Sequence, residues 1–122
     1  MPGEVKDEFP PLLELGFHRM SLQEVHNLCV VPFPRSTTRS AIMFGLSNVI
    51  HRLNESRLAL ELWIDGSFVT QKLNPDDSDV AVRFWGHELD SATEMQSQII
   101  QWAASDDPKL RHRCHCFRLL TT

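Results

Sequence analysis

Two aspartates separated by one residue, Asp77 and Asp79, are the side chains of this chain best suited to chemistry. An apolar segment typical of a strand, Val80 to Phe84, follows them. Because side chains alternate along a strand, both carboxylates project to the same side and repel each other unless a cation lies between them. Carboxylates at this spacing suit Mg²⁺, which keeps several waters and takes its other ligands from phosphates. The spacing therefore predicts a metal site at Asp77 and Asp79.

A possible phosphate-binding turn precedes these acids, since Gly66 and Ser67 end the previous apolar run and nine residues separate Ser67 from Asp77. Glycine lets the backbone approach a phosphate closely because it has no side chain in the way. Ser67 adds a hydroxyl and a backbone N–H for the same anion. Lys72, in the loop between, is a candidate triphosphate contact, with a solvated loop lysine as the alternative. A phosphate cradle facing a metal is the equipment of phosphoryl or nucleotidyl transfer.

The elements that must position these residues follow from apolar spacing and from capping and turn signals. Ser21 and Glu24 form a capping-box pattern at the start of a short helix. The strand over 58–64 is almost wholly apolar, which is expected of a strand covered on both faces. The inner face of the last helix is predicted at Ala92, Met95, Ile99 and Trp102, and Asp106-Asp107-Pro108 should end that helix. The sequence thus predicts helices over 21–29, from 36 or 37 to about 53, and over 88–104, and strands over 58–64, 78–84 and 113–120.

These elements predict one α/β domain of the α+β kind over residues 21–122. Its core would be a small mixed sheet of about three or more strands with two long helices packed on it. Residues 1–20 would be an extended N-terminal lead-in, since three prolines fall among the first 11 residues. Gly45, within the long helix, either permits close packing or occupies an indifferent surface position.

Composition narrows the function classes. The 122 residues carry a net charge of −4, which disfavours a general nucleic-acid coat. The acids concentrate in residues 60–107, which contain ten acidic and two basic residues. Residues 108–122 carry four bases and no acid. No apolar stretch reaches the roughly 18 residues of a membrane span, and no secretory leader is evident. Three cysteines without framework spacing favour a reducing, cytoplasmic setting.

With these residues in view, the chain resembles the polymerase-beta-type nucleotidyltransferase superfamily. It is most similar to a group of uncharacterised bacterial nucleotidyltransferase-like proteins with a Gly-Ser-Phe-Val-Thr-x-Lys-x-x-Pro-x-Asp-x-Asp motif. The resemblance runs from about Leu12 to Leu120. It implies a nucleotidyltransferase-like core, Mg²⁺ (with Mn²⁺ as an alternative) at Asp77 and Asp79, and an NTP substrate, with ATP favoured. The matching residues are Gly66, Ser67, Phe68, Val69, Thr70, Lys72, Pro75, Asp77 and Asp79, with looser fits at Leu15–His18 and Arg39.

Two departures from that pattern matter. Ser78 stands between the acids where the superfamily usually has an apolar residue, but this position faces away from the metal. Active members usually carry a third carboxylate on a later strand, and the strand predicted over 113–120 has none. His115 occupies the expected place. Imidazole is a poor Mg²⁺ ligand but can serve as a general base.

Two functions from different classes follow. The first is a metal-dependent nucleotidyltransferase that moves NMP from an NTP to a protein or RNA hydroxyl, with Asp77, Asp79 and His115 as catalytic residues. The resemblance suggests a toxin–antitoxin or phage-defence setting. The second is a catalytically degenerate relative that acts by binding a nucleotide or a protein partner, as an antitoxin does. A homodimer is a further expectation, and a membrane partner is not expected.

Several residues have weaker functional interpretations. Asp65 is an extra ligand or an acid that ends its strand, and Arg35 and Arg39 reach phosphates or lie on a solvated face. A zinc site at His112, Cys114, His115 and Cys116 is disfavoured, because Cys114 and Cys116 share one face of the strand while His115 faces the other way. An aromatic side chain that stacks a base is conceivable among Trp63, Phe68, Trp85 and Trp102, with core or rim packing as the alternative.

Overall fold

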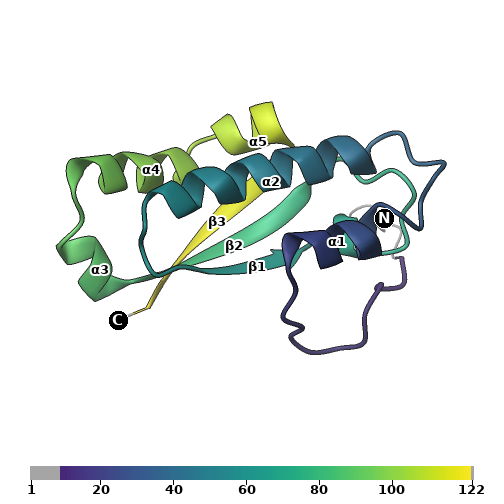
Figure 1. Cartoon of the computed structure of the whole chain (residues 1–122), viewed down its shortest axis with the longest axis horizontal. Coiled ribbons are helices and arrows are strands. Elements are labelled where there is room, and N and C mark those ends of the chain that lie inside the picture. The colour runs from purple at the N-terminus through teal and green to yellow at the C-terminus, as the bar shows by residue number, and fades with distance from the viewer. Residues whose placement is uncertain (1–8, 122) are drawn as a thin grey trace, which may run out of the picture.

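The computed structural model describes residues 9–121, and it shows helices gathered on one face of a three-stranded mixed sheet (Figure 1). The predicted fold class, a small mixed sheet with helices packed on it, is confirmed. β3 ends at the opposite end of the sheet from the described start of the chain (Figure 1). The elements are α1 (Leu22–Cys29), α2 (Arg39–Glu55), β1 (Glu61–Asp65), the 3₁₀ turn η1 (Ser67–Val69), β2 (Ser78–Trp85), α3 (Gly86–Asp90), α4 (Glu94–Ala104), α5 (Asp107–His112) and β3 (Cys114–Thr121).

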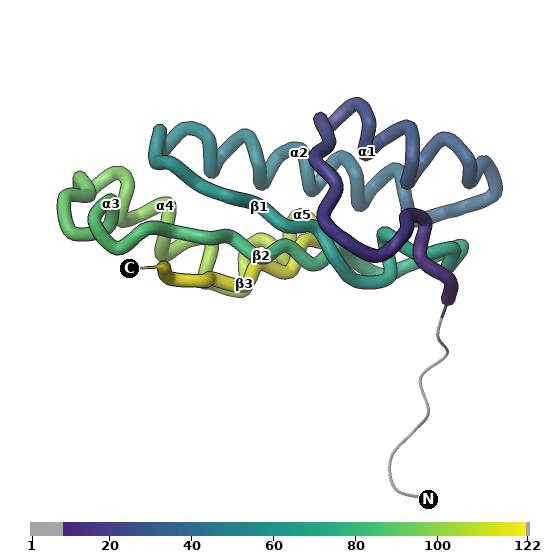
Figure 2. The backbone as a smooth tube through the Cα atoms, turned by 90° about the horizontal axis from the view of Figure 1, so that it is seen from below, coloured from purple at the N-terminus to yellow at the C-terminus, as the bar shows by residue number. Residues whose placement is uncertain are grey.

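The central strand β2 pairs with β1 antiparallel and with β3 parallel. Its residues alternate between buried and half-buried positions, so one face meets the helices and the other stays open. Figure 2 shows the strands side by side with the helices beyond them. The inner face of β2 consists of Ser78, Val80, Val82 and Phe84, and the open face of Asp79, Ala81, Arg83 and Trp85.

The first two helices form where the sequence predicts them, although α2 begins at Arg39, two or three residues after the predicted start. Ser21 and Glu24 make the expected capping box on α1. The apolar stripe of α2 is buried against the sheet, and Gly45 lies where α2 crosses α5. A Cβ atom on Gly45 would collide with the backbone of His112, so close packing is the correct interpretation of this glycine. The buried stripe of α2 comprises Ile42, Leu46, Val49 and Leu53.

The helix predicted over 88–104 is wrong as one element, because it breaks into α3 and α4. Thr93 caps α4 through a second capping box with Gln96, and Ala92 lies outside either helix. The buried face of α4 also differs from the predicted one. Met95 is consequently 51% exposed, while Ile99 remains buried as predicted. Ile100 and Ala103 supply the rest of the buried face.

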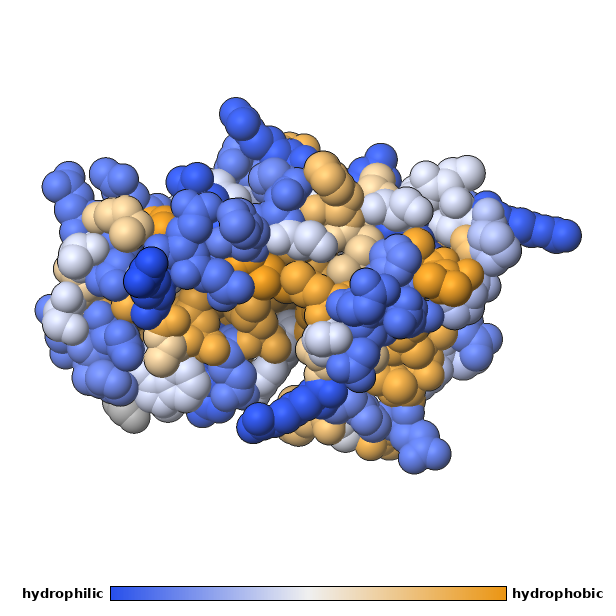
Figure 3. All heavy atoms as spheres, in the orientation of Figure 1, coloured by the Kyte–Doolittle hydropathy of each residue, from blue (hydrophilic) through white to orange (hydrophobic). Residues whose placement is uncertain are grey.

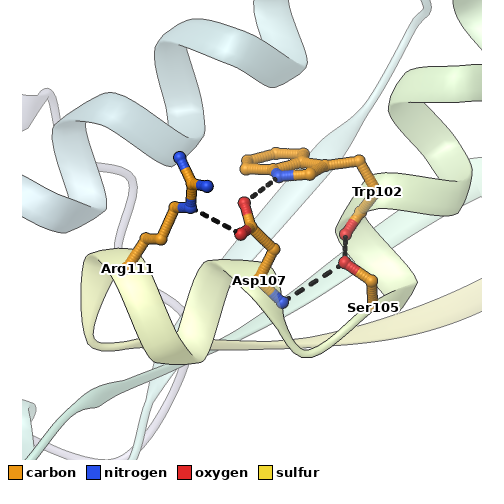
Figure 4. Close-up of polar contacts among 4 residues, drawn as sticks. All are labelled: Trp102, Ser105, Asp107 and Arg111. Carbon is orange, nitrogen blue, oxygen red and sulfur yellow. Dashed lines mark hydrogen bonds and ion pairs between the residues drawn. The ribbon is translucent and has the colours of Figure 1, made fainter.

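The segment predicted to end that helix instead begins a new one, α5, with Pro108 in its first turn. Asp107 accepts a hydrogen bond of 2.7 Å from the indole Nε1 of Trp102 and pairs with Arg111 at 2.8 Å (Figure 4). Ser105 donates to the carbonyl of Trp102 and accepts from the backbone N–H of Asp107. Asp107, one of the acids of the acidic stretch, is therefore a structural residue.

The strand predicted over 58–64 is shorter, and the expectation that it is covered on both faces is wrong. β1 begins at Glu61 and lies at one edge of the sheet. Leu58 and Leu60 precede it and pack against the core, which explains the apolar run.

The lead-in joins the domain through a short bridge, where Pro11 pairs with Thr70. The backbone N–H of Leu12 donates to the carbonyl of Val69 at 3.0 Å, and Gln71 N–H donates to the carbonyl of Pro10 at 2.9 Å. The segment then crosses near the C-terminal end of β1 (Figure 2). Residues 1–8, the first part of the predicted lead-in, lie outside the described residues.

Apolar side chains interrupt the polar surface along the middle of the face in Figure 3. Large apolar residues that are exposed include Leu15, Phe17, Phe44 and Leu110. No helix of residues 9–121 combines the length and the apolar character that a bilayer span requires.

Candidate functional site

The turn after β1 brings Gly66 against Asp79 on the neighbouring strand. Gly66 has φ +84°, a backbone conformation that glycine adopts without strain. A Cβ atom at this position would collide with the carboxylate oxygen Oδ2 of Asp79. The positive φ favours glycine here, and any side chain would also displace the end of the Asp79 side chain. Ser67 follows directly and starts η1, so the predicted Gly-Ser turn does meet the predicted acid.

Three chemically active side chains, Asp65, Asp79 and His115, form one row across the open face of the sheet, which we call the acidic row. Asp79 is in register with Asp65 on β1 and with His115 on β3. Nδ1 of His115 lies 3.7 Å from Oδ1 of Asp79, and the two side chains are 42% and 35% exposed. The structure therefore places the predicted residue His115 beside Asp79 on the open face of the sheet.

The charges around Asp79 are unbalanced. Burial raises the pKa of the Asp79 carboxyl above its usual value, and the neighbouring carboxylate of Asp77 raises it further. His115 opposes the shift, Asp65 adds to it, and Lys109 opposes it. A carboxyl whose pKa is raised by neighbouring carboxylates is the electrostatic condition that a bound cation relieves.

Ser78, between the two acids, faces the helices as expected and is fully buried. It stands in register with Cys114 on β3. Asp79 therefore projects to the open side of the strand. Asp77 lies just before β2, and its carboxylate is near enough to act on Asp79.

Lys109 of α5 is a cation near Asp79 that the sequence analysis did not name. Its signal was the run of bases after Pro108, which could be interpreted only once α5 was known to pack beside the sheet. Lys72, the predicted triphosphate contact, has its ammonium 5.9 Å from the ring of Phe9 in the lead-in. Its carbonyl accepts hydrogen bonds from Arg39. The structure therefore does not bring the Lys72 charge into the Asp79 row.

Arg39 was predicted either to reach phosphates or to lie on a solvated face, and both predictions are wrong. It is fully buried, and its guanidinium stacks on Phe33 at 3.8 Å from the ring centroid. The guanidinium donates to four backbone carbonyls that lie at the end of α1, in η1 and in the loop after it. These acceptors are the carbonyls of Cys29 (2.8 Å), Phe68 (2.7 Å), Thr70 (2.6 Å) and Lys72 (2.5 Å). Arg39 thereby fixes the backbone that follows the Gly-Ser turn.

The cysteines on β3 behave as core and rim residues. Cys114 is buried, Cys116 is half-buried, and their sulfur atoms lie 4.0 Å apart. The hydrogen bond between the two thiols lowers the pKa of Cys114 and raises that of Cys116. His112 contributes its ring to an edge contact with Trp102. Of the aromatic residues considered for stacking, Phe68 is buried in the core.

Within residues 9–121, no three His, Cys, Asp or Glu side chains are grouped closely enough to hold a metal ion by themselves. Mg²⁺ does not require such a group, because one or two carboxylates suffice when water and substrate phosphates supply the remaining ligands. The donors at Asp77 and Asp79 are oxygens, as Mg²⁺ and Mn²⁺ prefer. The residues present thus fit an ion that is shared with a phosphate substrate.

The fold and the site together define a small α+β domain with an acidic row beside a glycine turn, at one end of an open sheet. The chain belongs to the family of unknown function DUF6932, whose model matches residues 6–121. No curated protein and no solved structure matches the chain.

Proposed function

We propose that this protein is a metal-dependent nucleotidyltransferase that moves NMP from an NTP to a protein or RNA hydroxyl. The observation that carries the proposal is the close approach of the Gly66 backbone to the Asp79 carboxylate. A side chain at this turn would collide with that carboxylate. A backbone turn pressed against clustered acids has little structural purpose, because the acids repel one another. It is useful where a phosphate and a cation must meet.

Asp77 and Asp79 would hold the ion, Mg²⁺ or Mn²⁺, and His115 lies at the edge of this pair. The bound ion would neutralise triphosphate charge and orient the leaving pyrophosphate. The backbone N–H and hydroxyl of Ser67 would donate to the triphosphate, and Gly66 would let that group approach the backbone.

His115 stands where the resemblance places the third acid, and we propose that it accepts the proton of the acceptor hydroxyl. That hydroxyl oxygen bonds to the α-phosphorus while the bond from phosphorus to the β-bridging oxygen breaks. Pyrophosphate leaves, and the proton passes to the imidazole. The Asp79 carboxylate, 3.7 Å away, stabilises the resulting imidazolium.

A second candidate is a catalytically degenerate protein that binds a nucleotide or a protein partner. The observation that favours it is His115 itself, because the row contains an imidazole where catalysis in the superfamily uses a carboxylate. The open face of the sheet is available to a partner in this case. A cytoplasmic toxin–antitoxin or phage-defence role remains a prediction from the resemblance under either candidate.

Label transfer from each of four α-³²P NTPs into cell lysate, with Mg²⁺ and then Mn²⁺, tests the first candidate. We expect a labelled protein or RNA with wild type and none with Asp77→Asn/Asp79→Asn. Asp76→Asn is the matched control, because Asp76 is an exposed acid beside the pair.

Two variants at one position refine the test. His115→Ala should slow labelling by about 100-fold if the imidazole acts as a base. His115→Asp should retain or raise labelling with Mg²⁺. Absence of label with every nucleotide and metal, in lysate that contains native partners, would exclude the enzyme and leave the binding protein.

A further inference from the structure

The open face of the sheet carries a second row, next to the acidic one. Trp63 on β1, Ala81 on β2 and Phe117 on β3 are in register. Each follows or precedes a member of the acidic row by two residues, so all three side chains project to the same open side. Two residues along a strand span about 7 Å. An aromatic row with a small residue at its centre therefore lies one step from Asp79 and His115.

Both aromatic side chains of this row are held in place, Phe117 exposed and Trp63 half-buried under the guanidinium of Arg83 at 5.7 Å from its ring centroid. Phe117 is 47% exposed, and its ring contacts that of His115 at a centroid distance of 4.2 Å. The indole Nε1 of Trp63 donates to Glu61 at 2.6 Å. Phe17 of the lead-in, itself 86% exposed, contacts Trp63 at 5.2 Å and extends the aromatic surface on the β1 side. Rings that are fixed on the open face of a sheet and at least partly exposed are suited to stacking on a flat partner.

A planar ring system of the size of a nucleobase matches this row. Aromatic side chains on an open sheet stack bases, and each stacked base contributes enough to change affinity several-fold or more. The distance also fits, because a ribose separates the base of a nucleotide from its α-phosphate. If the phosphates lie at Gly66 and Asp79, the base reaches the neighbouring row and not a distant one.

The charges on this face favour a mononucleotide over a long nucleic acid. Arg83 is the cation at the centre of the next row, and it is engaged by Thr121 at 2.7 Å and by Glu61 at 3.9 Å. Binding of a polynucleotide depends on many phosphate contacts. The whole chain has a net charge of −4. One engaged arginine and an acidic chain supply few such contacts.

We propose that Trp63, Ala81 and Phe117 form the platform on which the base of the substrate NTP stacks. The proposal rests on the proposed function, since the phosphates of the same nucleotide must lie at Gly66 and Asp79. Stacking without hydrogen-bond recognition tolerates all bases and favours the larger purine rings. The platform thus predicts a purine preference without strict selection between ATP and GTP.

Calorimetric titration of the full chain in Mg²⁺ distinguishes the contribution of the base to affinity from that of the phosphates. The probes are ATP, UTP and inorganic tripolyphosphate, which has no base. We expect ATP to bind about tenfold more tightly than tripolyphosphate, with UTP between them. Phe117→Leu and Trp63→Leu should each bring ATP close to the tripolyphosphate affinity and leave tripolyphosphate binding unchanged. Leu120→Ala is the control. Leu120 is an exposed apolar residue of β3, as Phe117 is, but it is in register with Phe84 on the inner face of β2.

Each other outcome is decisive. Equal affinities of ATP and tripolyphosphate in wild type, or ATP affinity unchanged in both platform variants, would overturn the platform while the phosphate cradle stands. Tripolyphosphate that fails to bind, with ATP that binds through Phe117 alone, would keep the platform and overturn the cradle. If no probe binds, both proposals fail. A single-stranded pentaadenylate that depends on Phe117, while ATP does not, would reassign the platform to an RNA acceptor and overturn the assignment to the NTP.

Discussion

Two regions border the Gly66-Ser67 turn and differ in how their charges are compensated. One is the buried surroundings of Arg39, and the other is the open face of the sheet around Asp79. On the helix side, the Arg39 guanidinium is fully buried and donates to four carbonyls. Burial lowers the pKa of Arg39 and raises that of the neighbouring Cys29 thiol to about 11, so the thiol stays neutral. On the open side, Asp79 lies beside two further carboxylates that raise its pKa.

The difference indicates which charge serves structure and which serves a ligand. Buried charge is tolerated when every donor has an acceptor, and Arg39 meets this condition through backbone alone. Repelling carboxylates on an open face reduce stability and persist where a cation repays the cost. We therefore expect changes around Arg39 to act on folding, and changes around Asp79 to act on binding.

The largest effect is expected from Arg39→Met. It leaves four carbonyls without their donor and should lower the free energy of unfolding by about 3–5 kcal/mol. Urea unfolding monitored by circular dichroism measures the change. Arg39→Lys should recover only part of the loss, because one ammonium cannot match the guanidinium fork. Arg35→Met, at an exposed neighbour, is the control and should be nearly neutral. A loss below about 1 kcal/mol for Arg39→Met would remove the structural half of the comparison.

Gly45→Ala should have the next largest effect, again on folding. The added methyl meets the His112 backbone, which cannot move without shifting α5. Overpacking of this kind typically costs about 1–3 kcal/mol. The thermal midpoint should fall accordingly, whereas Ser40→Ala on the exposed side of α2 should leave it unchanged. An unchanged midpoint for Gly45→Ala would mean that α2 and α5 pack less tightly than the structure has them.

The elements with strong local signals were the ones predictable from sequence. The capping box at Ser21, the stripe of α2 and the alternation of β2 each depend on neighbours a few residues away. His115 was singled out only through the resemblance, and its place beside Asp79 depends on the parallel pairing of β2 and β3, which the sequence did not predict.

The failures have a common physical origin in signals that support two structures. Asp106-Asp107-Pro108 can end one helix or begin another, since proline is favoured in a first turn. The apolar spacing through Ala92 concealed the capping box at Thr93. Arg39 resembled a surface residue because its acceptors are carbonyls, which no side-chain pattern reveals.

Gly66→Ala links the two regions and should act on both folding and binding. The alanine must adopt φ +84° and displace the Asp79 carboxylate, which should cost about 1–2 kcal/mol. Under the proposed function, tripolyphosphate binding in Mg²⁺ should be lost as well. Titration of the folded variant at a temperature well below its midpoint separates the two effects. Ser67→Ala is the milder comparison and should weaken binding with little loss of stability.

Asp79→Asn should have the smallest effect on stability and the opposite sign. The folded-state pKa of Asp79 is raised, mainly by burial and then by Asp77, so the ionised carboxylate is disfavoured in the folded protein. Ionised Asp79 therefore lowers the free energy of unfolding. This loss is absent below the unfolded pKa of about 4 and is fully present once the pH has risen through the folded pKa. Asn should therefore stabilise the protein at pH 7, by less than about 1 kcal/mol because solvent screens the site.

The pH and metal dependence of this variant make the test specific. The stabilisation should vanish near pH 3, where the carboxyl is protonated in both states. Mg²⁺ should raise the thermal midpoint of wild type and not that of Asp79→Asn, since a bound ion stabilises the state that binds it. Asp76→Asn should show neither effect. If Asp79→Asn instead lowers stability at pH 7, the carboxylate is a structural acceptor like the carbonyls around Arg39. The contrast between the two regions would then be wrong.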